Sequence, residues 1–289
     1  MSEPGGSPTE RAARAIASAD ALLIGAGAGM GVDSGLPDFR GPEGFWRAYP
    51  AYETLGLRFE AIANPEHFEA DPPLAWGFYG HRTNLYRATA PHRGFAILRR
   101  WSERMASGGF VFTSNVDHHF HKAGFDPGRV VECHGSIEHR QCLGRCGVGI
   151  FEADPAEIRV DPETFRAEGP LPACPGCGGL ARPNILMFGD WGWDSSRTDR
   201  QLDRLQSWLG GPGPARLAVV EIGAGRAIPT VRRFCEQAAS RAGATLIRIN
   251  LREAEVPPGH LGLAIGGLEG LRAIDDLLSG SPGARLDPG

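Results

Sequence analysis

Two close pairs of cysteines form the clearest metal-binding pattern in this chain of 289 residues. Three residues separate Cys142 from Cys146, two separate Cys174 from Cys177, and 27 residues lie between the pairs. Four thiolates in this arrangement are the ligand set of a tetrahedral zinc site. A redox-active thiol pair is the alternative. The pattern predicts a structural Zn²⁺ that takes no part in chemistry, because all four ligands come from the protein.

A glycine-rich turn follows the first apolar run of the chain. Residues 21–24 are apolar, and every second position from 25 to 31 is then glycine. An apolar strand that ends in glycines lets a parallel sheet bring its backbone close to a phosphate. The strict dinucleotide fingerprint is absent, because Met30 and Val32 hold the places of its third glycine. A tight turn without a ligand is therefore the alternative.

Three later side chains could act on a small ligand. Asn115 and Asp117 follow the apolar run 110–112, and a carboxamide beside a buried carboxylate suits recognition of a primary amide such as nicotinamide. An Asx turn is the structural alternative. His134 is a candidate general base, since the unperturbed pKa of histidine lies near the working pH.

Four short apolar runs end at small or polar residues that could bind a ligand. They are residues 21–24, 110–112, 217–222 and 245–249. Helical patterns lie between them, for example at residues 91–105 and 228–241. This alternation predicts an α/β fold with a Rossmann-like, doubly wound parallel sheet. Ligands bind such sheets at the carboxyl ends of the strands, so the four runs predict one shared crevice.

Composition narrows the class of protein. The chain is 42% hydrophobic and 22% charged with a net charge of −4, which is typical of a soluble globular protein. No basic stripe favours nucleic acid, and no apolar run is long enough for a membrane span. Ser7 and Glu10 have capping-box spacing and predict an N-terminal helix rather than a secretory signal. We expect a cytoplasmic protein, in which cysteines stay reduced or bind metal.

The motifs and their order resemble the sirtuin family. Residues 27–41 resemble the NAD loop of that family, with Gly31 where serine is usual. Residues 113–117 resemble its T-Q-N-I/V-D motif, and residues 132–136 its E-L-H-G-S segment. The resemblance extends from residue 22 to about residue 278. It implies a large Rossmann-like domain, a smaller zinc-binding and helical domain, and an active cleft between them.

The resemblance implies NAD and Zn²⁺ as cofactors. It places the following residues on NAD: Gly27, Ala28, Gly29, Asp38, Phe39, Arg40, Ser114, Asn115, Val116, Asp117, Gly223, Ala224, Gly225, Asn250 and Leu251. Phe39 would shield the nicotinamide–ribose bond from water. Asn115 and Asp117 would orient the leaving amide, and with His134 they form the implied catalytic set.

The implied activity is NAD-dependent protein-lysine deacylation, with acylated-lysine proteins or peptides as partners. In the family mechanism the acyl oxygen attacks C1′ of the nicotinamide ribose and nicotinamide leaves. His134 would then deprotonate a ribose hydroxyl, which attacks the resulting imidate, and water completes the release of lysine and O-acyl-ADP-ribose.

One helical turn suggests the acyl group. Tyr79 and Arg82 are three residues apart, so both side chains can face one pocket. In one sirtuin class such a Tyr-x-x-Arg pair binds the carboxylate of succinyl-lysine, a task that suits the bidentate fork of arginine. The alternative is that Tyr79 belongs to the core and Arg82 is a surface charge.

Departures from the family pattern keep two other functions open. Residues 191–194 replace a proline-containing stretch, which favours an NAD glycohydrolase or a protein ADP-ribosyltransferase. Gly31, Ser114 and Ala224 also depart, which favours a non-catalytic NAD or ADP-ribose sensor. The presence of His134 argues against a sensor, because a sensor has no need for a base.

The resemblance also divides the chain. The NAD-binding domain comprises residues 9–47, 92–137 and 212–279. A helical insertion, residues 48–91, and a zinc module, residues 138–190, form the small domain. Residues 280–289 form a flexible tail.

Overall fold

The computed structural model describes residues 5–37, 49–54, 56–210 and 215–280. Its larger part contains a parallel sheet of strand order β3-β2-β1-β7-β8-β9. The strands are β1 (Ala21–Ala26), β2 (Gly109–Thr113), β3 (Val130–Glu132), β7 (Leu217–Ile222), β8 (Thr245–Ile249) and β9 (Leu261–Leu263). The predicted Rossmann-like fold is confirmed. Four strands match the four apolar runs, whereas β3 and β9 are three residues each and were not predicted.

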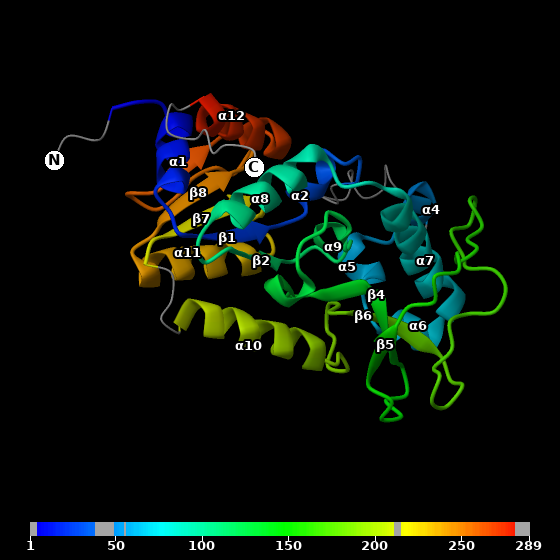
Figure 1. The fold of residues 1–289 in the computed structure, drawn as a ribbon. Coiled ribbons are helices and arrows are strands. Elements are labelled where there is room, and N and C mark those ends of the chain that lie inside the picture. The colour runs from blue at the N-terminus through cyan, green and yellow to red at the C-terminus, as the bar shows by residue number, and fades with distance from the viewer. Residues whose placement is uncertain (1–4, 38–48, 55, 211–214, 281–289) are drawn as a thin grey trace, which may run out of the picture.

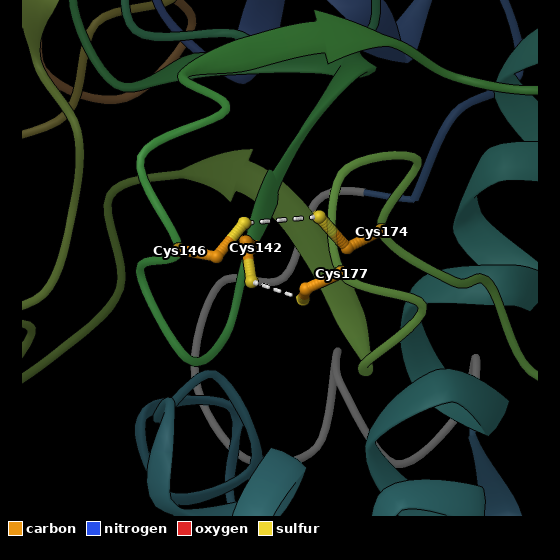
Figure 2. A group of neighbouring side chains, drawn as sticks. All are labelled: Cys142, Cys146, Cys174 and Cys177. Carbon is orange, nitrogen blue, oxygen red and sulfur yellow. Dashed lines mark hydrogen bonds between the residues drawn. The ribbon is translucent and has the colours of Figure 1, made fainter.

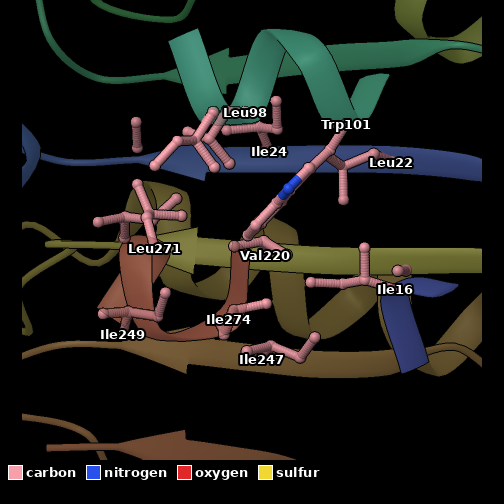
Figure 3. Close-up of a cluster of buried hydrophobic side chains, with 14 of the residues drawn as sticks. Ile16, Leu22, Ile24, Leu98, Trp101, Val220, Ile247, Ile249, Leu271 and Ile274 are labelled. Atoms are coloured by element: carbon pink, nitrogen blue, oxygen red, sulfur yellow. The ribbon is translucent and has the colours of Figure 1, made fainter. Parts of the chain in front are cut away.

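Helices cover both faces of this sheet (Figure 1). α1 (Pro8–Ala17), α8 (Arg93–Arg104) and α12 (Gly267–Gly280) pack on one face, and α10 (Ser196–Gly210) and α11 (Thr230–Ala242) on the other. Strand residues alternate between the two faces. Leu22 and Ile24 pack with Leu98 and Trp101 of α8, as Figure 3 shows, and Leu23 faces α11. No helix in the described part of the chain has the length and apolarity of a membrane span.

The capping box predicted at the N-terminus is formed. Ser7 Oγ accepts from the backbone N–H of Glu10 at 3.2 Å, and the Ser7 N–H donates to Glu10 Oε2 at 2.7 Å. These bonds satisfy backbone donors that the first helical turn leaves unpaired. The pattern therefore marks the start of α1 by local chemistry alone.

A smaller part of the molecule combines an antiparallel sheet of order β5-β4-β6 with short helices and the longer helix α7 (Figure 1). Its elements are β4 (Gly135–Cys142), β5 (Ile150–Glu152), β6 (Ala181–Ile185), α4 (Pro50–Thr54), α5 (Phe59–Ile62), α6 (Glu66–Ala70) and α7 (Pro72–Ala88). Trp76 of α7 is buried and donates from Nε1 to the Ala181 carbonyl at 3.0 Å, which joins the helices to the sheet. The predicted division into domains stays a prediction, and its boundary after residue 137 falls within β4.

α11 lies so close to β1 that position 25 has no room for a side chain. A Cβ at Gly25 would lie 2.2 Å from Cys235 Sγ and 3.1 Å from Val231 Cγ1. Cys235 is fully buried. This approach fixes the distance between helix and strand immediately before the glycine turn.

We expect Gly25→Ala to lower the free energy of unfolding by about 1–3 kcal/mol, because it overpacks this contact. Cys235→Ala removes the clashing sulfur, so the double variant should be more stable than the sum of the single effects predicts. Urea denaturation of the zinc-loaded protein measures all three variants. Gly210→Ala, where a Cβ meets no atom within 4 Å, is the matched control. Strictly additive effects of Gly25→Ala and Cys235→Ala would contradict the packing argument.

Candidate active site

The carboxyl ends of the central strands meet at one edge of the large sheet. Ala26 pairs with Thr113 on one side and with Ile222 on the other, and Ile222 pairs with Ile249. β1 and β7 are neighbours at the centre of the sheet. The strands after β1 are added on one side of this central pair, and the strands after β7 are added on the other side. Such a reversal of strand order is where open α/β sheets bind ligands. The register therefore brings the four predicted loop segments to one edge.

The turns after β1 and β7 touch backbone to backbone. The Gly27 N–H donates to the Ile222 carbonyl and the Gly29 N–H to the Gly223 carbonyl, each at 3.0 Å. A Cβ at Gly27 would lie 2.6 Å from Ala224 Cα, and one at Gly223 would lie 2.4 Å from the Gly29 carbonyl carbon. Gly223 also has φ 63°, a left-handed conformation that favours glycine. Both glycines are thus required by the contact between turns, as well as by any ligand.

Asn115 and Asp117 fasten the end of β2 to the first turn. Asn115 donates from Nδ2 to the Gly27 carbonyl at 3.0 Å. Asp117 is buried, and its Oδ1 accepts from the His119 N–H at 2.9 Å, so the Asx turn considered as an alternative is present. Its Oδ2 would lie 3.7 Å from a Cβ at Gly31. One carboxylate oxygen therefore shapes the backbone while the other faces the glycine turn.

The pKa of the Asp117 carboxyl is raised above its usual value in water. Burial raises the pKa of this carboxyl, and the nearby His119 and Arg82 oppose that effect. Val116 packs in one buried cluster with Tyr79 and Tyr86, which places α7 next to the end of β2.

His134 lies where the chain leaves the large sheet for the small one. The Cys133 N–H donates to the Thr113 carbonyl at 2.8 Å, and the Leu186 N–H donates to the His134 carbonyl at 2.9 Å. The side chain is half-buried, and burial lowers the pKa of its imidazole. The ring is consequently neutral at pH 7 and can accept a proton.

Asn250 holds the second turn from β8. Its Nδ2 donates to the Ala224 carbonyl at 2.9 Å, and its Oδ1 accepts from the Arg252 and Glu253 N–H groups at 3.1 and 3.0 Å. These bonds make Asn250 a positioning residue for the turn. Leu251, which follows it, is 64% exposed at the sheet edge.

The remaining residues assigned to NAD divide into two groups. Ser114 donates its backbone N–H to the Ala26 carbonyl, and Val116 is buried. Asp38, Phe39 and Arg40 lie outside the described residues. The expected water shield over the ribose is therefore a prediction from the sequence.

Tyr79 and Arg82 lie side by side on α7. Tyr79 belongs to the core, as the alternative interpretation expected, whereas its expectation of a surface charge at position 82 is wrong. Arg82 is only 7% exposed. Its guanidinium donates from Nε and Nη2 to the Tyr86 hydroxyl at 2.9 and 2.7 Å, and its Cζ lies 5.7 Å from the Tyr79 ring centre and 5.1 Å from that of Phe78. Tyr86 was missed in the sequence, although its spacing of four residues from Arg82 was the available signal.

The four cysteines converge as predicted (Figure 2). Cys142 Sγ lies 3.7 Å from Cys177 Sγ and Cys146 Sγ 3.5 Å from Cys174 Sγ, and all four sulfurs lie within 4.8 Å of one another. A tetrahedral zinc with Zn–S bonds of about 2.3 Å requires sulfurs about 3.8 Å apart. The close contacts run between the two pairs rather than within them, which does not fit a redox pair. The arrangement fits Zn²⁺.

Local backbone groups support these thiolates. Burial raises the pKa of the Cys174 thiol, but the N–H groups of Cys177 and Gly176, together with the thiols of Cys146 and Cys142, lower that pKa to about 7. The Gly179 N–H donates to Cys177 Sγ at 3.4 Å. In the longer first loop Arg145 adopts φ 51°. Arg145 thus takes a left-handed conformation in the loop between Cys142 and Cys146, which is one residue longer than the loop between Cys174 and Cys177.

The unusual stretch at residues 191–194 is held against the small sheet. Gln141 donates from Nε2 to the Gly192 carbonyl at 2.7 Å, and its Oε1 accepts from the Asp194 N–H at 3.0 Å. Asn184 donates from Nδ2 to the Asp194 carbonyl at 2.9 Å. Trp191 is 95% exposed. This stretch is therefore an ordered surface beside the zinc centre.

Comparisons with known proteins agree with this geometry. The Sir2 family model matches residues 27–204. The NAD-dependent protein deacylase sirtuin-5, mitochondrial, of Danio rerio is 34% identical over 190 residues, which cover 61% of this chain and 59% of that protein. An NAD-dependent protein deacylase of Thermococcus sibiricus is 34% identical over 63% of this chain and 65% of its own length. The matched region thus spans about three fifths of these relatives.

A longer alignment and the solved structures extend the likeness. An NAD-dependent protein deacylase of Pyrococcus abyssi is 30% identical over 246 residues, which cover 85% of this chain and 88% of that protein. A Sir2 homologue in complex with NAD has a TM-score of 0.69 at 25% identity and covers 96% of this chain and 95% of its own. A Sir2 homologue mutant in complex with ADP-ribose has a TM-score of 0.70 at 23% identity, with coverage of 99% and 100%.

Loss of one zinc ligand should remove the metal and loosen the small sheet. We expect Cys174→Ser to reduce the tightly bound zinc to less than one tenth of its normal content, because structural zinc needs all four ligands. The thermal midpoint should fall by at least about 5 °C, equivalent to about 2 kcal/mol for a chain of this size. Mass spectrometry for metals after dialysis and a thermal scan measure both effects. Cys235→Ala, which removes a buried cysteine outside the cluster, should keep the zinc. Full zinc retention by Cys174→Ser would contradict the four-cysteine centre.

Proposed function

The chain belongs to the Sir2 family, and from this we propose that it is an NAD-dependent protein-lysine deacylase. Its products would be nicotinamide, O-acyl-ADP-ribose and free lysine. The observation that carries the proposal is the meeting of two glycine turns, Asn115 with Asp117, and the half-buried His134 at the carboxyl edge of one parallel sheet.

The turns after β1 and β7 suit a bound dinucleotide. Gly27 and Gly29 have no side chains and lie just beyond the carboxyl end of β1, where parallel sheets bind dinucleotides, although their own N–H groups donate to the Ile222 and Gly223 carbonyls. When bound, NAD supplies the ribose carbon from which nicotinamide departs and the ADP-ribose that receives the acyl group. The chain itself has only to bind, orient and move protons.

Asn115 and Asp117 are matched to a primary amide. Asn115 directs Nδ2 to the Gly27 carbonyl, which leaves Oδ1 as the atom that can accept from an amide N–H. Asp117 Oδ2 faces the same turn. Together they would hold the carboxamide plane of nicotinamide, and this orientation lowers the entropic cost of reaching the transition state.

His134 is suited to remove the proton of a ribose hydroxyl. Its ring is neutral at pH 7 because burial lowers the pKa of the imidazole. The segment from Cys133 to Gly135 is fixed by backbone bonds to both sheets, so the ring is held at their junction. A positioned base of this kind contributes about 10²- to 10⁴-fold to a rate.

We propose that the substrate is a protein or peptide with an acylated lysine. We also propose that its acyl group carries a carboxylate, as succinyl does. Arg82 is a buried cation surrounded by the rings of Tyr79, Phe78 and Tyr86. A guanidinium in such a dry site binds a carboxylate more strongly than one in water does.

Mass spectrometry of one peptide that carries acetyl- or succinyl-lysine tests the activity. We expect loss of the acyl group only when NAD is present, with one nicotinamide formed for each lysine released. His134→Ala should lower turnover at least about 100-fold while NAD still binds, because only the base is lost. Cleavage of NAD without loss of the acyl group would instead show a glycohydrolase or an ADP-ribosyltransferase. Absence of both reactions would favour a sensor.

Replacement of Arg82 by Met should separate the two acyl groups. We expect succinyl turnover to fall about 10- to 100-fold more than acetyl turnover, because a charge-assisted bond contributes about 1.5–3 kcal/mol. The acetyl reaction of the same variant controls for any general damage to α7. Arg82→Lys keeps the charge without the fork and should have an intermediate effect. Equal losses of both reactions in kcat/KM measurements would refute a role for Arg82 in acyl selection.

A further inference from the structure

A second group of metal-ligand side chains lies apart from the four cysteines. It contains His118 and His121, at either end of the first turn of α9 (His119–Lys122), and Glu132 at the end of β3. One nitrogen of each histidine and one oxygen of Glu132 lie within 4.8 Å of one another. Nothing in the deacylation chemistry proposed above uses these side chains.

The two imidazoles converge on a single oxygen. Nδ1 of His118 lies 3.7 Å and Nδ1 of His121 3.9 Å from Glu132 Oε1. The rings are stacked and parallel, with centres 4.1 Å apart and planes 2° apart. Both distances exceed that of a hydrogen bond. His118 Nδ1 is buried and has no hydrogen-bond partner among the described residues.

These distances are close to those between ligands of one metal ion. Donor atoms at about 2.0–2.1 Å from a tetrahedral ion lie about 3.4 Å apart. The two nitrogen–oxygen distances exceed this by about 0.3–0.5 Å, and the stacked rings would also have to turn so that the ion lies in the plane of each ring. A cation between them would also satisfy the unpartnered nitrogen of His118, which is costly to leave buried without a partner.

The contacts of Glu132 leave one of its oxygens free for a cation. Its side chain is 2% exposed and is paired with the guanidinium of Arg197. Arg197 Nη2 lies 2.5 Å from Oε2, which leaves Oε1 as the atom that faces the histidines.

The backbone and the solvent exposure are also consistent with a site. His118 has φ 64° and ψ 12°, a left-handed conformation that is unfavourable for most side chains and collects at functional positions. The side chains of His118 and His121 are 27% and 11% exposed, whereas that of Glu132 is 2% exposed. The histidines thus offer a path from solvent to a buried carboxylate.

We propose that His118, His121 and Glu132 form a second metal site, which takes a divalent transition metal of the zinc type. Two imidazoles and one carboxylate favour such ions over Mg²⁺ or Ca²⁺, which prefer all-oxygen ligands. Water would complete the coordination on the exposed side. The site is independent of the cysteine centre, which has four ligands of its own.

Titration of the zinc-loaded protein with Co²⁺ tests this site. The readouts are calorimetry and the visible absorption of the cobalt, which differs between nitrogen and oxygen ligands and thiolates. His118→Asn removes one ligand and keeps a residue that tolerates the left-handed backbone. His121→Ala removes the second. His260→Ala is the matched control, because His260 precedes β9 at the opposite edge of the sheet from β3.

We expect the wild type and His260→Ala to bind one Co²⁺ per chain in addition to the zinc, without thiolate absorption. The affinity should fall more than tenfold in His118→Asn and in His121→Ala. Co²⁺ should raise the thermal midpoint of the wild type and not that of His118→Asn, a readout that holds even if His121→Ala folds poorly. The proposal would be overturned if the wild type bound no additional Co²⁺, or if the absorption showed Co²⁺ bound to the cysteine thiolates in place of zinc. Equal affinity of His118→Asn and the wild type for Co²⁺ would also overturn it.

Discussion

The contact between the turns after β1 and β7 is the constraint on which the rest of the site depends. Backbone meets backbone there, with Gly27 against Ala224 and Gly223 against Gly29, at distances that exclude any side chain. The contact lies where the strand order reverses. Asn115 from β2 and Asn250 from β8 each donate an amide N–H to a carbonyl of these turns. Residues that follow β1, β2, β7 and β8 thus fix the position of the two turns.

The small sheet depends on the same edge. The chain passes from β3 through His134 directly into β4, and Gly135 there lies too close to the Asn184 carbonyl for any Cβ. The zinc ligands stand at the far end of β4, at Cys142, and on the loops beyond it. Zinc would therefore act on chemistry only through the rigidity of this strand, whose first residue follows the proposed base.

Burial determines the charge of the polar groups near the cleft. It raises the pKa of Asp117 and lowers that of His134, so each group moves toward its neutral form. Glu132 is equally buried but remains ionised, because His118 and Arg197 stand beside it. Arg82 keeps its charge among aromatic rings. Desolvation thus shifts the pKa of a group toward the value that favours its neutral form, and a nearby partner of opposite charge reverses the shift.

The sequence by itself determined the features that depend on near neighbours in the chain. The capping box, the four longer strands and the two cysteine pairs were readable, because capping, strand periodicity and zinc ligation each require particular residues at short fixed spacings. Only the tertiary structure decided which distant groups meet. Tyr86 joins Arg82 through the packing of α7, and Glu132 meets two histidines through the pairing of β3 with β2. The tertiary structure also shows a second reason why position 27 must be glycine, which is its contact with the turn after β7. The amide of Asn250 holds that turn in place. The physical reason is that strand register and helix packing, which few local residues specify, set the distances between such groups.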